Sequence, residues 1–379
     1  MGPLEAYAAG HPVAPAHAVR PPLAFPEGDA GRLAHYFDRL RAASCPEGAA
    51  AEPTDLGLSV KPITLGRLGI RRSGVGELTY VAGFALDSDN PHFGGLSGVD
   101  FLDDGSLFAV SDQGDRVWID MDEDGVTPVS ARISPLLDAD GTPLQGKLEA
   151  DAEGVAANEG WAFVSFERDH RVLAYDLAGC GSASRGAPIN GVSLPQAMAN
   201  AGIEAEDNGG PEPLAVTPDG YLFIGVETQK DGAGPLSARP LESAEVFDMS
   251  VGEGAPAFVG ADLLVDEDGD VRLFTLHRGY SKDTGNAIVI GESRLERHLN
   301  QADLPARIVS EIDERSRYEF RKTSERRLAE MGAILFNVDN FEAIAARDMG
   351  DGRVRLYILS DDNFSASQRT LMMVFDLAN

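Results

Sequence analysis

One pattern recurs along the chain and limits the folds open to it. A short apolar stretch starts with an acid, a turn of Asp-Gly or Glu-Gly follows, and a stretch rich in β-branched and aromatic residues comes next. The turns are Asp104-Gly105, Glu159-Gly160, Asp219-Gly220, Asp268-Gly269 and Asp351-Gly352. Such turns suit hairpins, because glycine adopts a positive φ at low cost. Repeats of about 40–50 residues that hold several strands are typical of β-propeller blades.

The repeats predict an all-β fold, a β-propeller, over residues 59–379. At about 50 residues a blade this length gives six blades, of which five are visible as repeats. The strand-like segments Lys61–Ile70 and Glu77–Leu86 are candidates for the sixth. Strands from both termini would then close the ring and leave no open sheet edge.

Two segments depart from the pattern. Residues 1–58 are rich in Ala, Pro and Gly and predict an irregular extension, with a possible short helix at 30–42 whose Leu33, Phe37 and Leu40 lie on one stripe. Residues 293–332 are dense in Glu and Arg and read as a charged insertion in the propeller. We expect this insertion to be partly helical, with one or two surface helices; strands paired between charged turns are the alternative.

Charge excludes some partners. The net charge of −29 disfavours nucleic acid, whose recognition needs Lys and Arg against phosphates, and it disfavours acidic membrane surfaces. No apolar run is long enough to insert into a membrane. No secretory signal is written in the chain. Cys45 and Cys180 either pair or stay free.

The acids that start the repeats are the candidate metal ligands. In a propeller the inner strands line a central channel, so equivalent residues meet at its mouth. The acids are Glu153, Glu212, Asp262 and Glu342, with Asp100 or Ser97 in the first blade. Two carboxylates about 4 Å apart repel by about 4 kcal/mol at an effective dielectric of 20, so such a ring needs a cation, an arginine or a proton. Calcium suits it, since it accepts six to eight oxygens. Repeated salt bridges between blades are the structural alternative.

A second tier of polar residues ends the strands that follow: Asp112, Glu167-Arg168, Glu227, His277-Arg278 and Asp361-Asp362-Asn363. The arginines either neutralise the ring or bind a substrate's negative charge, for which Arg168, Arg278 and Arg369 are the candidates. Asp112 and Asp361 are the candidate general bases.

Several motifs together resemble the bacterial phytase-like family, described as "esterase-like activity of phytase". They are Gly94-Gly95-Leu96-Ser97-Gly98, Ser111-Asp112-Gln113-Gly114, Asp151-Ala152-Glu153-Gly154, Asn340-Phe341-Glu342 and Ser360-Asp361-Asp362-Asn363-Phe364-Ser365. The resemblance implies a β-propeller with calcium-assisted hydrolysis of phosphoesters or esters, in proteins that are commonly exported. Its matching acids fall on Glu153, Glu212, Glu342, Asp112 and Asp361. The chain departs from the family at Ala343, where a Gly is usual.

These observations support competing functions. The first is a calcium-dependent hydrolase of phosphoric or carboxylic esters that takes a small anionic substrate at the channel mouth. The second is a propeller that binds a ligand or protein without turnover and holds a structural cation. The third is a protein-interaction module that needs no metal. The family suggests a periplasmic or extracellular location, and the missing signal leaves a cytoplasmic one open.

Overall fold

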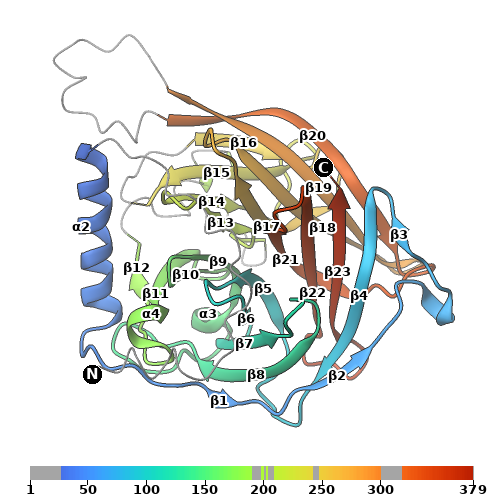
Figure 1. Cartoon of the computed structure of the whole chain (residues 1–379), viewed down its shortest axis with the longest axis horizontal. Helices are drawn as coiled ribbons and strands as arrows, with labels where there is room; N and C mark the ends of the chain where they lie inside the picture. The colour runs from blue at the N-terminus through green and yellow to red at the C-terminus, as the bar shows by residue number, and fades with distance from the viewer. Residues whose placement is uncertain are drawn as a thin grey trace.

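The computed structural model describes residues 27–189, 198–199, 202–203, 209–241, 247–299 and 318–378. Within these residues five antiparallel sheets surround a central axis (Figure 1). Their inner strands are β5 (Leu96–Phe101), β9 (Ala152–Asn158), β13 (Leu214–Val216), β17 (Ala257–Val265) and β21 (Asn340–Asp348). Each inner strand contacts the next in chain order, and β21 contacts β5, so the ring is closed. The chain folds as a five-bladed β-propeller.

The outer strands follow the inner ones in sequence order. The first blade adds β6 (Leu107–Ser111), β7 (Asp115–Met121), β8 (Pro128–Pro135) and, at its edge, β1 (Thr54–Asp55). The second adds β10 (Trp161–Phe166), β11 (Arg171–Asp176) and β12 (Ala187–Pro188). The third adds β14 (Tyr221–Gly225), β15 (Gly234–Pro240) and β16 (Phe247–Val251). The fourth adds β18 (Val271–Ser281), β19 (Gly285–Leu299) and β20 (Tyr318–Gly332).

The fifth blade is built from both ends of the chain. It adds β22 (Arg353–Asp361) and β23 (Thr370–Ala378), and then β4 (Leu78–Asp87), β2 (Ser59–Pro62) and β3 (Gly74–Val75). Strand β4 pairs with β23, so the N-terminal strands close the ring as predicted. They do so as outer strands of the fifth sheet, and the prediction of a sixth blade is wrong for the described part of the chain. The segments that suggested it, Lys61–Ile70 and Glu77–Leu86, overlap β2 and β4 of the fifth sheet, and the long strands β19 and β20, each of 15 residues, take up further chain length in the fourth.

The charged insertion is not helical where the structure describes it. Its residues 293–299 belong to β19 and its residues 318–332 to β20, and the two strands pair antiparallel. The alternative of paired strands is therefore correct for these two segments, and the expected helices are absent from them. Residues 300–317 lie outside the described residues.

The turns between paired strands agree with the sequence prediction. Gly105, Gly220, Gly269 and Gly352 have φ between 80° and 87°. In the second blade both Glu159 and Gly160 have positive φ, as a two-residue hairpin of type I′ requires.

Helix α2 (Glu27–Ser44) contains the residues 30–42 for which the sequence predicts a short helix. Its buried Tyr36 and Leu40 pack in one apolar cluster with Trp161 of the second blade. A disulfide joins Cys45, just after α2, to Cys180 in the short helix α4 (Leu177–Cys180). The residues before 27 lie outside the description. No described helix is long and apolar enough to cross a membrane.

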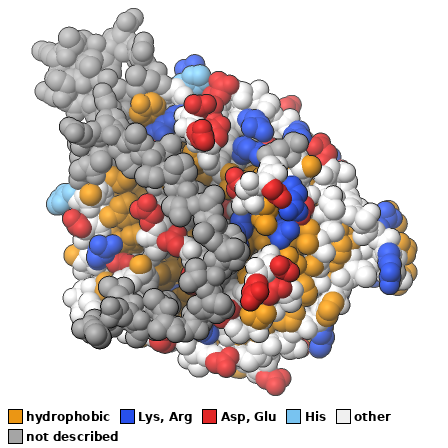
Figure 2. Space-filling model, viewed as in Figure 1, with side chains coloured by type: hydrophobic (Ala, Val, Ile, Leu, Met, Phe, Trp, Pro, Cys, Tyr) orange, Lys and Arg blue, Asp and Glu red, His pale blue; other side chains and the backbone are white. Residues whose placement is uncertain are grey.

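Apolar side chains fill the space between neighbouring blades. Phe108 of the first blade and Phe166 of the second share one buried cluster, and Phe223 of the third and Phe274 of the fourth lie in the clusters on either side of β17. At one edge of the propeller, beside β3 and the short helix η1 (Arg67–Gly69), the molecule projects outward. Figure 2 shows Lys or Arg side chains next to hydrophobic side chains on this projection. The packed blades hold the ends of the inner strands in fixed positions.

Candidate functional site

A β-bulge near the start of the inner strands sets the ring of equivalent positions. In four blades the pairing of the inner strand with its neighbour skips one residue, and the skipped residues are Ser97, Glu153, Val259 and Glu342. In the third blade Glu212 lies two residues before β13 starts to pair. A bulge turns its extra residue out of the regular alternation. Acids therefore occupy the ring position in the second, third and fifth blades.

A glycine after the bulge lets neighbouring blades approach closely. A methyl group on Gly154 would lie 1.9 Å from the carbonyl oxygen of Glu212, and one on Gly260 would lie 2.4 Å from that of Glu342. Neither position has room for a side chain. The backbone of the acid in one blade therefore packs directly against the glycine of the blade before it. This close packing brings the acids of neighbouring blades together.

Five carboxylates of the second and third blades gather in two overlapping groups, which we call the acidic cluster. The first group is Asp151, Glu153 and Glu167, and the second is Glu167, Glu212 and Glu227; in each, one oxygen per residue lies within 4.8 Å of the others. The members come from the starts of β9 and β13 and from just after β10 and β14. Antiparallel strands place these positions at the same end of the propeller.

Burial and like charge make three members of the acidic cluster, Glu153, Glu167 and Glu212, hard to ionise. Burial, and after it the neighbouring carboxylates, raise the pKa of Glu153 and of Glu212 well above the usual value. Burial also raises the pKa of Glu167, although the backbone N–H of Gly209 donates to Glu167 Oε1 at 2.5 Å. These three carboxyls therefore hold protons more readily than usual unless a cation compensates them.

Arg278 compensates the acids on the fifth-blade side of the mouth. Its guanidinium donates to Glu342, to Asn340 Oδ1 at 2.5 Å and to Glu227 Oε1 at 3.2 Å. Asn340 Nδ2 also donates to Glu342 Oε1 at 2.9 Å. Burial raises the pKa of Glu342 to about 8 even though Arg278 opposes the shift. Glu342 lies outside the two groups of the acidic cluster and is joined to them through Arg278 and Glu227.

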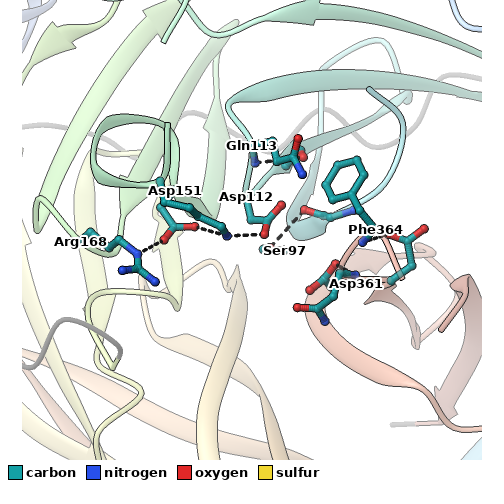
Figure 3. A network of polar contacts seen from close by, with 12 residues as sticks. Ser97, Asp112, Gln113, Asp151, Arg168, Asp361 and Phe364 are labelled. Atoms are coloured by element: carbon teal, nitrogen blue, oxygen red, sulfur yellow. Dashed lines mark hydrogen bonds and ion pairs between the residues drawn. The ribbon is translucent and has the colours of Figure 1, made fainter. Parts of the chain in front are cut away.

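A chain of ion pairs connects the acidic cluster to the first blade (Figure 3). Arg168 Nε donates to Asp151 Oδ2 at 2.7 Å, and Lys147 Nζ lies 2.8 Å from Asp151 Oδ1 and 2.5 Å from Asp112 Oδ2. Asp112 Oδ1 is buried and has no hydrogen-bond partner among the described residues. One carboxylate oxygen of Asp112 is thus left for a further contact.

Asp361 faces Asp112 from the fifth blade, at the end of β22 (Figure 3). Burial raises the pKa of Asp361 to about 6, and the nearby Asp112 adds to the shift. The backbone N–H of Asn363 donates to Asp361 Oδ1 at 2.6 Å, and Asn340 Nδ2 lies 3.4 Å from Oδ2. A carboxyl with this pKa is mostly ionised at neutral pH and still basic enough to accept a proton.

Asp262, expected as a metal ligand, does not lie at the ring position. Its carboxylate accepts from the backbone N–H groups of Leu263 and Ala346, both at 2.6 Å. The ring position of its blade is Val259, three residues earlier and about 10 Å along the strand. Asp100 in the first blade does the same as Asp262, since it accepts from the N–H of Ala157 at 2.6 Å. Both acids bind the inner strand of the next blade.

The other expected residues lie as follows. Arg369 is half exposed, and its Nε lies 3.4 Å from Asp339 Oδ2, one residue before Asn340. His277 points away from Arg278: it is buried, its Nε2 lies 3.1 Å from Thr275 Oγ1, and burial lowers its pKa to about 4. Sequence reasoning placed no role on Lys147, Asp151 or Asn340. The i,i+4 spacing of Lys147 and Asp151 around the short helix α3 (Lys147–Ala150) was the available signal.

Comparison with known proteins gives one sequence match. A family model described as "Phytase-like: Esterase-like activity of phytase" matches residues 91–364. A search of curated proteins found no relative of this chain.

Solved propeller structures share only a distant likeness. The PQQ-bound aldose sugar dehydrogenase from Streptomyces coelicolor is 14% identical, with a TM-score of 0.39 over 85% of this chain and 99% of that one. The glutaminyl cyclase of Myxococcus xanthus is 12% identical, with a TM-score of 0.39 over 81% of this chain and 100% of the other. Neither similarity is strong enough to bear on what this site does.

Proposed function

The chain belongs to the phytase-like family, and from this premise we propose that it hydrolyses phosphoric or carboxylic esters with a calcium ion at the channel mouth. The acidic cluster is the observation that carries the proposal. Five carboxylates, three of them with a raised pKa, meet where a propeller displays its channel, and oxygen ligands in flexible number are what calcium accepts. The excess of acids over the whole chain also favours cations near it.

The proposed ligands are Asp151, Glu153, Glu167, Glu212 and Glu227, in place of the set expected from the repeats. Glu342 stands beside them with its charge balanced by Arg278, and Asp262 is left out. Bound calcium would polarise a phosphoryl or acyl oxygen of the substrate and lower the pKa of a water molecule.

Asp361 and Asp112 are the proposed bases. The raised pKa of Asp361 suits it to take a proton from water near neutral pH. We assign to Asp112 the binding and orientation of a water molecule. One of its carboxylate oxygens has no hydrogen-bond partner among the described side chains and backbone. Lys147 holds the other oxygen and fixes the direction of the carboxylate.

Cationic side chains at the mouth are the proposed contacts for an anionic substrate. Arg168 is one-third exposed and Lys147 about half exposed at their side chains. Arg278 is more enclosed and its main effect is to balance Glu342 and Glu227. Arg369 is half exposed and lies beside Asp339. We assign substrate contacts to Arg168 and Lys147 first, and to Arg278 and Arg369 after them.

One observation favours a second function, a binding propeller with a structural cation and no turnover. Arg168, Arg278 and Arg369, all expected to bind substrate, each pair with a carboxylate of the protein. Such ion pairs stabilise the ring of acids at the channel mouth, and they occupy the guanidinium groups that a substrate would otherwise bind.

A single assay separates the two functions. Release of p-nitrophenol from p-nitrophenyl phosphate and from p-nitrophenyl esters is followed with calcium and with a chelator, for the wild type and for Glu153→Gln, Asp361→Asn and the exposed control Glu330→Gln. Hydrolysis predicts calcium-dependent release that falls by about a hundredfold in the first two variants and persists in the control. Calcium that raises Tm while every substrate stays intact supports the structural cation instead.

The disulfide supports an exported protein. Cys45 and Cys180 are joined, and disulfides persist in oxidising compartments such as the periplasm. We therefore propose a periplasmic or extracellular location, in line with the family expectation. Labelling of thiols in protein taken directly from cells tests it, since a cytoplasmic protein would show both cysteines reduced.

A further inference from the structure

A group of exposed apolar side chains lies at the projecting edge between the fourth and fifth blades. We call it the edge patch: Leu68, Ile70, Tyr280, Ile334 and Leu335. Leu68 is 91% exposed, Tyr280 73% and Ile334 62%. Of the seven large apolar side chains that are exposed within the described residues, these are five. Single exposed apolar residues are ordinary, but a cluster marks a contact site.

Backbone hydrogen bonds hold three loops of the edge patch together. The N–H of Arg67 donates to the carbonyl of Leu335 at 3.1 Å, and that of Asn337 to Leu65 at 2.9 Å. The N–H of Ala333 donates to Asn286 at 3.0 Å, and Asn286 pairs with Tyr280 across the β18–β19 hairpin. The patch is therefore preformed, and little ordering would be needed when it binds.

Leu68 has an unfavourable backbone conformation. Its φ is 56°, in the left-handed region that a leucine rarely enters. Neither burial nor local backbone preference favours leucine at this place. An apolar side chain that is exposed at such a φ is a candidate for a contact outside the chain.

The loops of the edge patch are basic in a strongly acidic protein. They carry Arg67, Arg71, Arg72 and Lys282 against two acids, Asp283 and Asp339, and Asp339 Oδ2 lies 3.4 Å from Arg369 Nε. The nearby Glu77 and Glu330 are paired with Arg326 and Arg327. Figure 2 shows Lys or Arg and hydrophobic side chains together at this edge. At physiological salt, charges more than about 8 Å away are largely screened, so this local excess decides what approaches the edge.

We propose that the edge patch docks on the surface of a lipid bilayer that contains anionic lipid. Apolar side chains with a basic flank and an amphipathic tyrosine are the chemistry of an interfacial anchor. A stable protein interface needs about 20–30 residues a side, and the edge patch offers far fewer. The whole-chain charge predicts repulsion from such a membrane, and the edge patch is the local exception. Docking by this edge is independent of any hydrolysis at the channel mouth.

Co-sedimentation with vesicles tests the proposal. The full chain is spun with vesicles of phosphatidylcholine plus phosphatidylglycerol, and with phosphatidylcholine alone. The expected result is binding to the anionic vesicles that weakens with salt and falls by about tenfold in Leu68→Gly combined with Ile334→Ser. Arg71→Ser combined with Arg72→Ser is expected to lose the preference for anionic lipid. Leu68→Gly suits the backbone at this φ, so folding is kept.

The control is Val129→Ser, an exposed apolar residue of β8 far from this edge in sequence, which is expected to bind vesicles like the wild type. The proposal is overturned if no vesicles bind, if both vesicle types bind equally, or if the patch variants bind as well as Val129→Ser. It is also overturned if sedimentation shows a dimer that the patch variants abolish, because a second copy of the chain would then cover the edge.

Discussion

The two sides of the channel mouth carry acids at the same ring position but balance them differently. On the side of the second and third blades, Glu153 and Glu212 stand among further carboxylates of the acidic cluster. On the fifth-blade side, Glu342 has an arginine and an asparagine as built-in partners. The blade boundaries differ as well: Gly154 admits no methyl group, whereas Ala343 carries one.

This difference shows that the repeat determines where the acids lie, whereas the side chains of each blade determine how the charge of its acid is compensated. A ring of equivalent acids does not have to bind one ion symmetrically. On the fifth-blade side Arg278 lies against Glu342, whereas no ion pair is found for Glu153 or Glu212 among the described residues, so we expect a cation to be needed there. The predictions below each alter one side and leave the other as a reference.

Removing the built-in partner has the largest expected effect. Arg278→Gln removes the counter-charge of buried Glu342 and half-buried Glu227, and we expect it to lower the free energy of unfolding by about 4 kcal/mol in the presence of a chelator above pH 8, where Glu342 is ionised. Denaturant unfolding measures it. Arg327→Gln breaks an exposed pair with Glu330 and is the matched control, with a loss below about 1 kcal/mol. Equal losses of unfolding free energy in the two variants would mean that Arg278 does not compensate the charge of Glu342 and Glu227.

The pH dependence of stability follows next. The pKa of Glu342 rises from 4.5 to about 8 on folding, so between these values the folded state holds a proton that the unfolded chain has lost. Stability contributed by this proton is present below pH 4.5 and is lost as pH rises toward 8. We expect a fall of about 3 kcal/mol between pH 5 and 8 in chelator. Unfolding curves across this range measure it, and Glu342→Gln should reduce the slope.

Calcium is expected to act on the other side of the comparison. Metal binding needs deprotonated carboxylates, so added calcium should flatten the part of the pH dependence that comes from Glu153 and Glu212. A slope that is the same with calcium and with chelator would show that the metal does not reach those acids.

Substitutions at the boundaries between blades are expected to have the third-largest effect on stability. Gly154→Ala forces a methyl group against the carbonyl oxygen of Glu212, and we expect a loss of about 2 kcal/mol in unfolding free energy together with weaker calcium binding. Ala343→Gly at the corresponding place in the fifth blade should cost about 1 kcal/mol and leave calcium binding intact. If Gly154→Ala is tolerated without loss, the close approach of β9 and β13 is not required.

The smallest effect is expected at Asp262. Asp262→Asn keeps one acceptor for the N–H groups of Leu263 and Ala346, so it should cost about 1 kcal/mol and leave calcium affinity unchanged. Calcium titration of this variant checks the corrected register directly, since a fall in affinity would return Asp262 to the ligands.

Much of the fold was visible in the sequence because turn chemistry repeats. The Asp-Gly turns and the acids Glu153, Glu212 and Glu342 mark the blades correctly. The number of blades was missed because β19 and β20 are unusually long, so residues per blade are not constant. The closing role of the N-terminal strands was expected from Glu77–Leu86, but the pairing of β4 with β23 makes it an outer strand of the fifth blade and not part of a sixth.

The site was predicted less completely than the fold. Asp262 was chosen by counting to the first acid of its repeat, whereas the bulge that defines the ring position falls on Val259. The sequence signal of the bulge is only the glycine that follows it at Gly98, Gly154 and Gly260. Lys147 was missed because it sits in a loop helix of four residues, and only the folded chain brings it to Asp112.

The central claim is that the acidic cluster binds a divalent cation, and calorimetric titration of calcium tests it most directly. Glu167 belongs to both groups of the cluster. The account predicts saturable binding by the wild type that falls by at least about tenfold in Glu167→Gln and is unchanged in Glu330→Gln. A wild type that binds no calcium, or a Glu167→Gln variant that binds it as tightly, would contradict the account.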